Sequence, residues 1–246
     1  MRRVLECFDF PPDSGENKGA FMDIRYAFAR FSGRMSFKLL RLIGSGATTL
    51  PGLICLMIDR DFVAKASRGT QAIIVTGTNG KTTTTRQIAA ILAHAGWSTM
   101  HNQSGSNLLR GVATMLAISP RAQWAVIETD EASFPEVIRH FPPYLVILLN
   151  LFRDQMDRYG EIDKTARRWG EALKNLPHSC RILVNGDDPS LGWIYHTLAQ
   201  HKPKNLFTFG IDDPSVGTEP PGGILPHTAD AVCAERSPEV RGAVPI

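Results

Sequence analysis

The stretch VTGTNGKTTTTRQ, from Val75 to Gln87, decides the fold. It follows a short apolar, β-branched run, Ala72 to Thr76, which predicts a strand. Helical periodicity then continues from Lys81 to Ala95 and ends at Gly96, a typical residue after a helix C-terminus. A strand, a glycine-containing turn and a helix together predict a phosphate-binding loop. Glycines let backbone N–H groups turn inward around phosphate oxygens, and the helix N-terminus favours an anion.

The loop also supplies a cation and hydroxyl groups. Lys81 is expected to reach the β- and γ-phosphates of a nucleotide, and the Thr82 hydroxyl is expected to bind Mg²⁺. The loop is shorter than the usual pattern, because its glycines are spaced G-x-x-G rather than G-x-x-x-x-G. The predicted nucleotide-binding residues are Gly77, Thr78, Asn79, Gly80, Lys81, Thr82 and Thr83.

A carboxylate for the metal is expected close to this loop. The segment AVIETDEASF contains a predicted strand, Trp124 to Glu128, with Asp130 and Glu131 just beyond it. An acid at the carboxyl end of a strand beside the phosphate loop is well placed to bind Mg²⁺, so Glu128 is predicted as the metal ligand. For Asp130 and Glu131 in particular, a helix N-cap or a solvated loop charge stays open as an alternative.

Strand and helix patterns alternate after residue 70. Further strands are predicted over Trp97–His101, Tyr144–Leu149, Arg181–Val184 and Asn205–Phe209, and further helices over Asn107–Ile118, Phe134–His140, Ile162–Leu176 and Pro189–Ala199. The predicted fold is therefore α/β, with a mostly parallel sheet flanked by helices. A short helical segment is expected to precede it.

Composition limits the class of protein. Apolar residues make up 43% of the 246 residues, which predicts a globular chain, and the net charge of +3 gives no argument for a nucleic-acid partner. The four cysteines contain no C-x-x-C pair and are interpreted as reduced thiols, so a cytoplasmic location is expected. No signal peptide is recognised, and the apolar runs are shorter than a membrane span needs.

Residues 22–70 are rich in Lys and Arg, and apolar residues recur among them at helical spacing. This pattern predicts a basic amphipathic segment with its apolar face buried and its basic face in water. The alternative is a surface that lies close to anionic lipid, which would place the protein at the inner face of the membrane.

Five motifs occur in a fixed order, and together they carry a family resemblance. They are VTGTNGKTTTT, NQSGSNLLRG, VIETDEASF, LLNLFRDQMDRYGE and VNGDDP. This order resembles the P-loop ATPase (central) domain of the Mur ligase superfamily. Within that superfamily, NLFRDQ-x-DRYGE resembles the MurT branch, the ATP-dependent subunit of lipid II isoglutaminyl synthase.

The resemblance implies further site residues. Asn107 matches an asparagine close to the γ-phosphate. A signature loop is matched by Asn150, Arg153, Asp154, Gln155 and Asp157. Gln155 stands where other Mur ligases carry the histidine of a D-H-L-D motif. The helix around Trp169 offers no lysine where the parent ligases often carry a carbamylated one, so a second metal site of that kind is not expected.

The resemblance also implies a reaction. The protein would use ATP and Mg²⁺ to activate the D-glutamate α-carboxylate of lipid II as an acyl phosphate. Ammonia from a GatD-type glutamine amidotransferase subunit would then convert it to an amide. Two alternatives stay open. One is a truncated ATP-binding module without ligase turnover, and the other is a different Mur-type ligase, such as a relative of folylpolyglutamate synthases.

The domain organisation follows from the same comparison. Residues 1–21 are expected to be an extension or a misassigned start, 22–70 the basic helical segment, 71–210 the central ATPase domain, and 211–246 a loop with the start of a zinc ribbon. Cys233 matches the first of the four ribbon cysteines, but no further ligand follows it. Zn²⁺ is therefore expected only with a complete ribbon, and the C-terminal ligase domain is expected to be missing.

Overall fold

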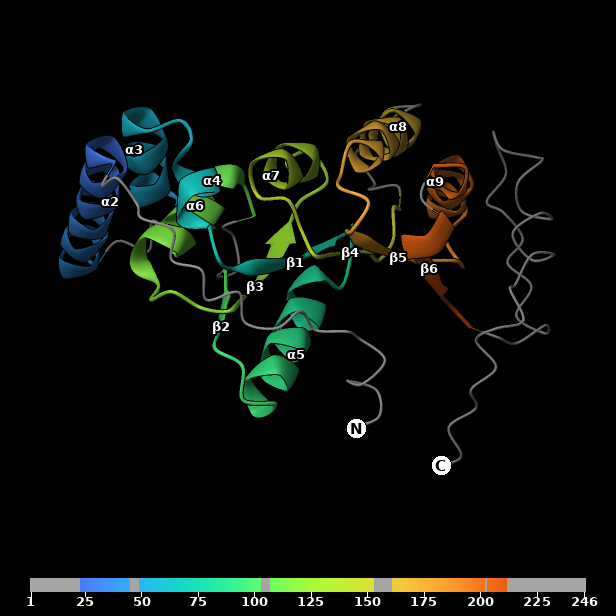
Figure 1. Ribbon diagram of the computed structural model, residues 1–246, viewed down its shortest axis with the longest axis horizontal. Coiled ribbons are helices and arrows are strands. Elements are labelled where there is room, and N and C mark those ends of the chain that lie inside the picture. Colours follow the sequence, from blue (N-terminus) through green and yellow to red (C-terminus); the bar gives the residue numbers. More distant parts are fainter. Residues whose placement is uncertain (1–22, 45–48, 103–106, 153–160, 202, 212–246) are drawn as a thin grey trace.

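The computed structural model describes residues 23–44, 49–102, 107–152, 161–201 and 203–211. They form one parallel sheet with helices on both faces (Figure 1). The strands are β1 (Gln71–Thr76), β2 (Thr99–His101), β3 (Trp124–Thr129), β4 (Leu145–Leu148), β5 (Arg181–Asn185) and β6 (Leu206–Phe209). The predicted α/β fold with a parallel sheet is thereby confirmed.

The strand order is β2-β3-β1-β4-β5-β6, and every neighbouring pair is parallel. The first strand of the sheet therefore lies in its middle, between β3 and β4. The chain winds from β1 toward one edge of the sheet and then returns to wind toward the other edge. Such a reversal opens a crevice at the carboxyl ends of the central strands, where ligands bind in open α/β sheets.

The central strands are largely apolar and buried because both of their faces are covered. β3 and β4 are buried at every position, as expected for a parallel sheet between helices. One face is covered by α5 (Lys81–His94), and the other face is covered by α6 (Leu109–Ile118), α7 (Phe134–His140), α8 (Glu161–Lys174) and α9 (Pro189–Ala199) (Figure 1). Two separate apolar clusters, one on each side of the sheet, form the core.

The predicted element boundaries are close to those observed. The helices Phe134–His140 and Pro189–Ala199 agree at both ends, and the other predicted elements after residue 70 are found with shifted ends. Gly96 has φ +90°, a left-handed conformation, directly after the C-cap of α5, as predicted. A short 3₁₀ helix, Pro203–Asn205, leads into β6.

Three helices precede the sheet and lie at its β2 end, namely α2 (Ile24–Leu42), α3 (Leu50–Ile58) and α4 (Phe62–Ala66) (Figure 1). Glycines bring them into close contact. A Cβ atom on Gly52 would lie 1.7 Å from the Arg110 carbonyl oxygen of α6, and a Cβ atom on Gly33 would lie 2.3 Å from the Cys55 sulfur. These helices share their core with the sheet. Their close packing depends on Gly33 and Gly52, because a side chain at either position would clash with the neighbouring helix.

The expectation that the apolar face of the N-terminal helix is buried is wrong. In α2 the buried residues are Ala29 and Gly33, whereas Phe28 and Phe31 are 59% and 60% exposed. The physical reason is the close approach of α3, which only small side chains permit. Helical periodicity identifies a stripe of apolar residues, but it does not say which side of the helix meets the core.

No helix within the described ranges is both long and apolar enough to cross a membrane. Cys55 and Cys180 are both buried, and Cys55 is a free thiol, in agreement with the interpretation of the cysteines as reduced. Burial raises the pKa of the Cys55 thiol to about 11, which keeps it protonated and unreactive at neutral pH. The domain boundaries proposed from the sequence stay predictions.

Candidate functional site

The predicted phosphate-binding loop lies between β1 and α5, at the carboxyl edge of the sheet. Gly77 and Gly80 have φ values of +145° and +83°, conformations that favour glycine. A Cβ atom on Gly77 would also lie 2.9 Å from the backbone nitrogen and oxygen of Asn150. Glycine is therefore needed at position 77 for two reasons. Its positive φ favours glycine, and the segment that follows β4 leaves no room for a Cβ atom.

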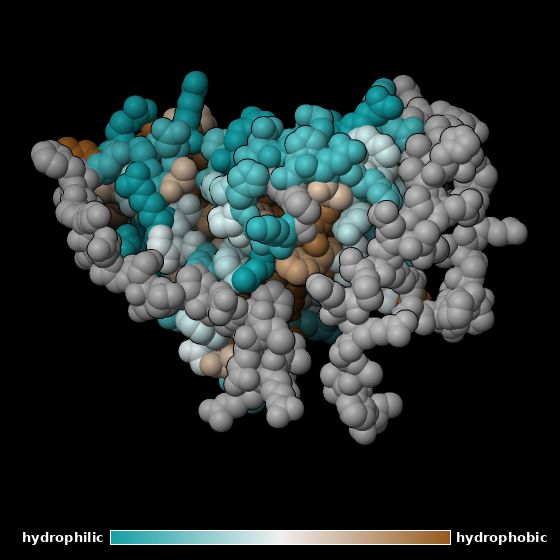
Figure 2. Space-filling view, turned by 45° about the vertical axis from the view of Figure 1, so that its right-hand side comes forward, coloured by the Kyte–Doolittle hydropathy of each residue, from teal (hydrophilic) through white to brown (hydrophobic). Residues whose placement is uncertain are grey.

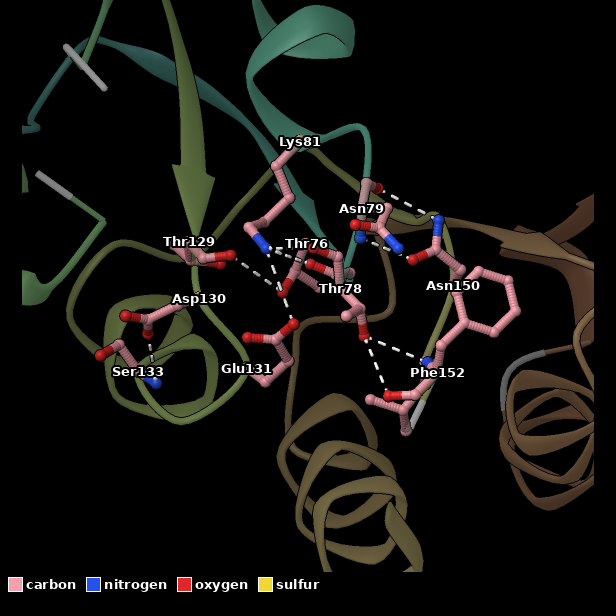
Figure 3. A network of polar contacts seen from close by, with 12 residues as sticks. Thr76, Thr78, Asn79, Lys81, Thr129, Asp130, Glu131, Ser133, Asn150 and Phe152 are labelled. Atoms are coloured by element: carbon pink, nitrogen blue, oxygen red, sulfur yellow. Dashed lines mark hydrogen bonds and ion pairs between the residues drawn. The ribbon is translucent and has the colours of Figure 1, made fainter. Parts of the chain in front are cut away.

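Asn150 holds the loop in shape (Figure 3). Its carbonyl oxygen accepts from the Thr78 N–H at 3.0 Å, and its side-chain oxygen accepts from the Asn79 N–H at 2.8 Å. Its side-chain nitrogen donates to the Asn79 carbonyl at 3.1 Å. Asn150 thus lies beside the loop, as the resemblance implied, and its amide is bonded to loop backbone. A direct contact with nucleotide stays a prediction.

Lys81 begins α5 and folds back over the loop. Its ammonium donates to the carbonyl oxygens of Gly77 and Thr78, the latter at 2.9 Å, and lies 3.6 Å from the Glu131 carboxylate (Figure 3). The side chain is only 15% exposed. The cation is therefore already positioned at the loop, partly shielded from water, where an anion would feel its charge strongly.

The two threonines that follow differ in their surroundings. Thr82 is half-buried and Thr83 is exposed, both in the first turn of α5. Among the described residues, none hydrogen-bonds to the Thr82 hydroxyl. This hydroxyl is available to a ligand at the helix N-terminus, which agrees with its predicted role.

Glu128 lies near the end of β3, paired in register with Val75 of β1. Its side chain is 1% exposed, and neither carboxylate oxygen has a hydrogen-bond partner within the described part of the chain. Its backbone is fixed by Asn102, whose side chain accepts from the Glu128 N–H at 2.9 Å and donates to the Glu128 carbonyl at 2.8 Å. A buried carboxylate without a partner is costly, and a cation would offset that cost.

Magnesium fits this donor set. Mg²⁺ prefers oxygen ligands and is usually held by one or two protein groups together with waters and substrate phosphates. Within the described ranges, no three His, Cys, Asp or Glu side chains come together as a metal-binding group. The Glu128 carboxylate and the Thr82 hydroxyl stay the predicted protein ligands of Mg²⁺, with the remaining positions left to phosphate and water.

Asn107 and the turn after β3 lie next to each other. The Asp130 N–H contacts the Asn107 carbonyl oxygen at 3.5 Å, and the side-chain oxygen of Asn107 is buried without a partner among the described residues. Asp130 accepts from the Ser133 N–H at 3.1 Å in the turn before α7, whose N-cap is Ser133 rather than Asp130. Glu131 instead faces Lys81, and its carbonyl oxygen accepts from the Trp169 indole at 2.9 Å.

Sequence reasoning missed two residues that support the site. Asn102 opens the NQSGSN segment and fixes Glu128, as described above. Asp188 lies in VNGDDP and accepts from the N–H groups of Ser190 and Leu191 at the start of α9, and from the Leu151 N–H at 2.7 Å. Burial raises the pKa of Asp188 above its usual value. An aspartate before a helix-starting proline signals an N-cap, but its bond to Leu151 depends on the fold.

Replacing Asp188 with alanine is expected to lower the free energy of unfolding by about 2–4 kcal/mol. The change removes a helix cap and leaves the buried Leu151 N–H without its acceptor. Chemical denaturation monitored by circular dichroism would measure it. Glu171→Ala, an exposed change on α8, is the control and is expected to alter stability by less than about 0.5 kcal/mol. Equal effects of the two substitutions would contradict the anchoring role of Asp188.

Several predicted residues lie outside the described ranges. Arg153, Asp154, Gln155 and Asp157 belong to residues 153–160, and Cys233 belongs to residues 212–246. Their predicted roles stay predictions. Glu128, Lys81 and the loop glycines come from segments that meet at the carboxyl ends of β1 and β3.

Comparison with known proteins places this site in a family. The family model described as the Mur ligase middle domain matches residues 75–220. The MurT subunit of lipid II isoglutaminyl synthase (glutamine-hydrolyzing) from Streptococcus pneumoniae is 36% identical over 172 residues, which cover 68% of this chain and 38% of that protein. The corresponding Staphylococcus aureus (strain COL) subunit is 36% identical over 159 residues, 63% of this chain and 36% of that protein. The chain thus spans well under half the length of these relatives.

Solved structures agree on the fold. MurF from Acinetobacter baumannii superimposes with a TM-score of 0.53 at 20% identity, over 65% of this chain and 34% of that one. MurF from Thermotoga maritima, solved in complex with ADP, superimposes with a TM-score of 0.50 at 16% identity, over 63% of this chain and 36% of that chain.

Proposed function

This chain belongs to the Mur ligase middle-domain family, and from this we propose that it is the nucleotide-binding part of an ATP-dependent ligase of peptidoglycan synthesis. More narrowly, we propose that the ligase amidates the D-glutamate α-carboxylate of lipid II. The similarity to MurT subunits over 68% of the chain supports this narrower proposal.

One observation carries the proposal. A phosphate-binding loop with its lysine in place lies at the end of β1, and a buried carboxylate without a described partner lies at the end of β3 beside it. A cation site next to an anion site is what the binding of a metal-chelated nucleoside triphosphate requires.

The chemistry that such a site supports is activation of a carboxylate. A carboxylate oxygen of the acceptor attacks the γ-phosphorus of ATP, an acyl phosphate forms, and ADP leaves. Ammonia then attacks the acyl carbon, inorganic phosphate is expelled, and an amide results. Bound Mg²⁺ would neutralise charge on the phosphates.

The residues of this chain would act by positioning and charge. Lys81 and the N–H groups of the loop would orient the β- and γ-phosphates, and Glu128 with Thr82 would hold the metal. Asn107, whose buried side-chain oxygen has no partner among the described residues, would lie at the γ-phosphate end of the site. Asn150 would keep the loop in its binding shape.

The partner and location follow from the same proposal. MurT is named as one subunit of a glutamine-hydrolyzing synthase, so a second subunit that releases ammonia from glutamine is required. We propose a GatD-type glutamine amidotransferase for this role, and lipid II at the cytoplasmic face of the membrane as the acceptor. No contact with nucleic acid is part of the proposal.

A second candidate is a nucleotide-binding module without ligase turnover. The two candidates share ATP binding and differ in turnover.

The test therefore measures both properties on the full chain. ATP binding is measured by calorimetry, and ADP release and lipid II amidation are measured with the GatD-type subunit, glutamine and Mg²⁺. Amidation that is lost in Lys81→Ala and retained in the surface variant Lys174→Ala is the expected result. ATP binding without amidation would support the second candidate, and a folded chain that does not bind ATP would contradict both. Glutamate addition to folate would indicate another Mur-type ligase.

A further inference from the structure

Helix α2 presents a line of large apolar side chains to solvent. The line, called here the α2 apolar stripe, consists of Ile24, Phe28, Phe31, Met35, Leu39 and Leu42. These residues are 43–83% exposed. Helix α3 packs beside α2 (Figure 1). Its residues Leu53 and Met57 are also exposed, at 39% and 75%.

In an ordinary amphipathic helix the large apolar side chains face the core, whereas in α2 they face solvent. The stripe recurs every three or four residues, so it follows one side of the helix, while Ala29 and Gly33 lie on the opposite side against α3. Single exposed apolar residues are normal on a protein surface, but a continuous row of six marks an interaction site. A few brown atoms are visible at the upper left edge of Figure 2, at the end of the molecule where α2 and α3 lie.

Positive charge accompanies the stripe. Arg30, Arg34, Lys38 and Arg41 follow one another along α2 at spacings of four, four and three residues, and α2 contains no acidic residue. Arg30 and Arg34 donate to carbonyl oxygens at the end of α6, Ser119 at 3.4 Å and Ala117 at 2.7 Å, and so fix the helix while retaining their charge.

Among the described residues, the acids close to α2 do not neutralise this row. Asp23 and Asp59 are both paired with Lys65, at 2.7 and 2.8 Å. Within the part of the chain that the structure describes, no carboxylate forms an ion pair with Lys38 or Arg41. The exposed surface of α2 is thus apolar along its centre and cationic along one side.

This combination selects one occupant. An anionic bilayer offers acyl chains for the stripe and phosphate headgroups for the cations, and amphipathic helices of this kind lie in the plane of the interface. A second copy of the same helix would bring a cationic row against another cationic row. Because charged side chains are costly inside a bilayer, the Arg and Lys residues of α2 favour a position at its surface over one across it.

We propose that the α2 apolar stripe, with Lys38 and Arg41 beside it, docks this protein on the surface of a bilayer that contains anionic lipid. The stripe enters the boundary between headgroups and acyl chains, and the cations contact phosphates. This inference is independent of the proposed ligase function, because vesicle binding requires neither nucleotide nor lipid II. Failure of one proposal is therefore distinguishable from failure of the other.

The test is flotation of the full chain with two kinds of vesicle, phosphatidylglycerol mixed with phosphatidylcholine, and phosphatidylcholine alone. We expect binding to the anionic vesicles only, weakening as salt rises. Two double variants test the stripe and the cations separately, namely Phe28→Ser with Phe31→Ser, and Lys38→Glu with Arg41→Glu. Each is expected to reduce partitioning of the protein onto anionic vesicles at least about tenfold. Arg30 and Arg34 are left unchanged because they donate hydrogen bonds to the end of α6. Replacing them would alter the stability of the fold as well as the surface charge.

Matched controls lie elsewhere on the molecule. Ile91→Ser on α5 removes an apolar side chain that is 43% exposed, and Arg167→Glu on α8 reverses an exposed charge. Both are expected to bind vesicles as the unchanged chain does, and circular dichroism checks that every variant is folded.

Three results would overturn the proposal. The first is a folded chain that does not float with anionic vesicles. The second is a chain that light scattering shows to be a dimer, and that becomes a monomer when Phe28→Ser is combined with Phe31→Ser while its flotation stays unchanged. That result would assign the stripe to contact with a second copy of the chain. The third is vesicle binding that appears only after residues 1–21 are removed, which would assign the stripe to that segment.

Discussion

Lys81→Ala is expected to weaken the binding of Mg–ATP at least about 100-fold, equivalent to about 2.7 kcal/mol. The ammonium is held at the loop by the carbonyl oxygens of Gly77 and Thr78 and is only 15% exposed. Its interaction with phosphate therefore needs little reorganisation and is weakly screened by water. Isothermal titration calorimetry with ATP and Mg²⁺ would measure the change.

The matched control is Lys174→Ala. Lys174 lies at the end of α8, far along the chain from the loop, and its partner is the exposed Glu171. Its removal is expected to leave ATP affinity within about twofold, because a surface ion pair contributes little. An affinity for ATP that is the same in Lys81→Ala as in the unchanged chain would remove Lys81 from the site.

Glu128→Gln is expected to change stability and binding in opposite directions. Without ligand, the variant is expected to be more stable by about 1–2 kcal/mol, because a buried carboxylate without a described partner becomes an uncharged amide. With Mg²⁺ and ATP, it is expected to lose most of the stabilisation that the ligands give the unchanged chain. The reason is that the metal loses its anionic ligand.

Thermal unfolding with EDTA, and again with Mg²⁺ and ATP, would measure both effects on one sample. Glu136→Gln, an exposed change on α7, is the control and is expected to follow the unchanged chain under both conditions. A ligand-free Glu128→Gln variant that is less stable, with unaltered dependence on Mg²⁺, would show instead that the carboxylate serves the fold.

The parts of this protein that could be predicted from sequence are those fixed by local pattern. β4 and the first four residues of β3 are apolar because helices cover both faces of these strands. Pro189 marks the first turn of α9 because proline suits the start of a helix. The phosphate loop was predictable for the same reason, since Gly77, Gly80 and Lys81 are neighbours in sequence.

The parts that could not be predicted depend on segments far apart in the chain. The bonds from Asn150 to Asn79, from Asn102 to Glu128 and from Asp188 to Leu151 exist only once the strands are ordered. The burial of Gly33, rather than of the apolar stripe on α2, likewise depends on α3, because only the neighbour decides which side of a helix is covered.

The central position of β1 has a consequence for the folding of this protein during its synthesis on the ribosome. β1 is made before the strands that flank it, and it must wait for β3 and β4 to emerge. The phosphate loop waits with it, because Asn150, which shapes the loop, follows Asn79 by 71 residues. Parallel pairing across such separations is slow to form. A nascent chain that has passed Lys81 therefore carries the loop sequence before the hydrogen bonds from Asn150 that shape the loop can form. Its apolar β1 strand stays unpaired, and prone to aggregation, until residues near 150 leave the exit tunnel.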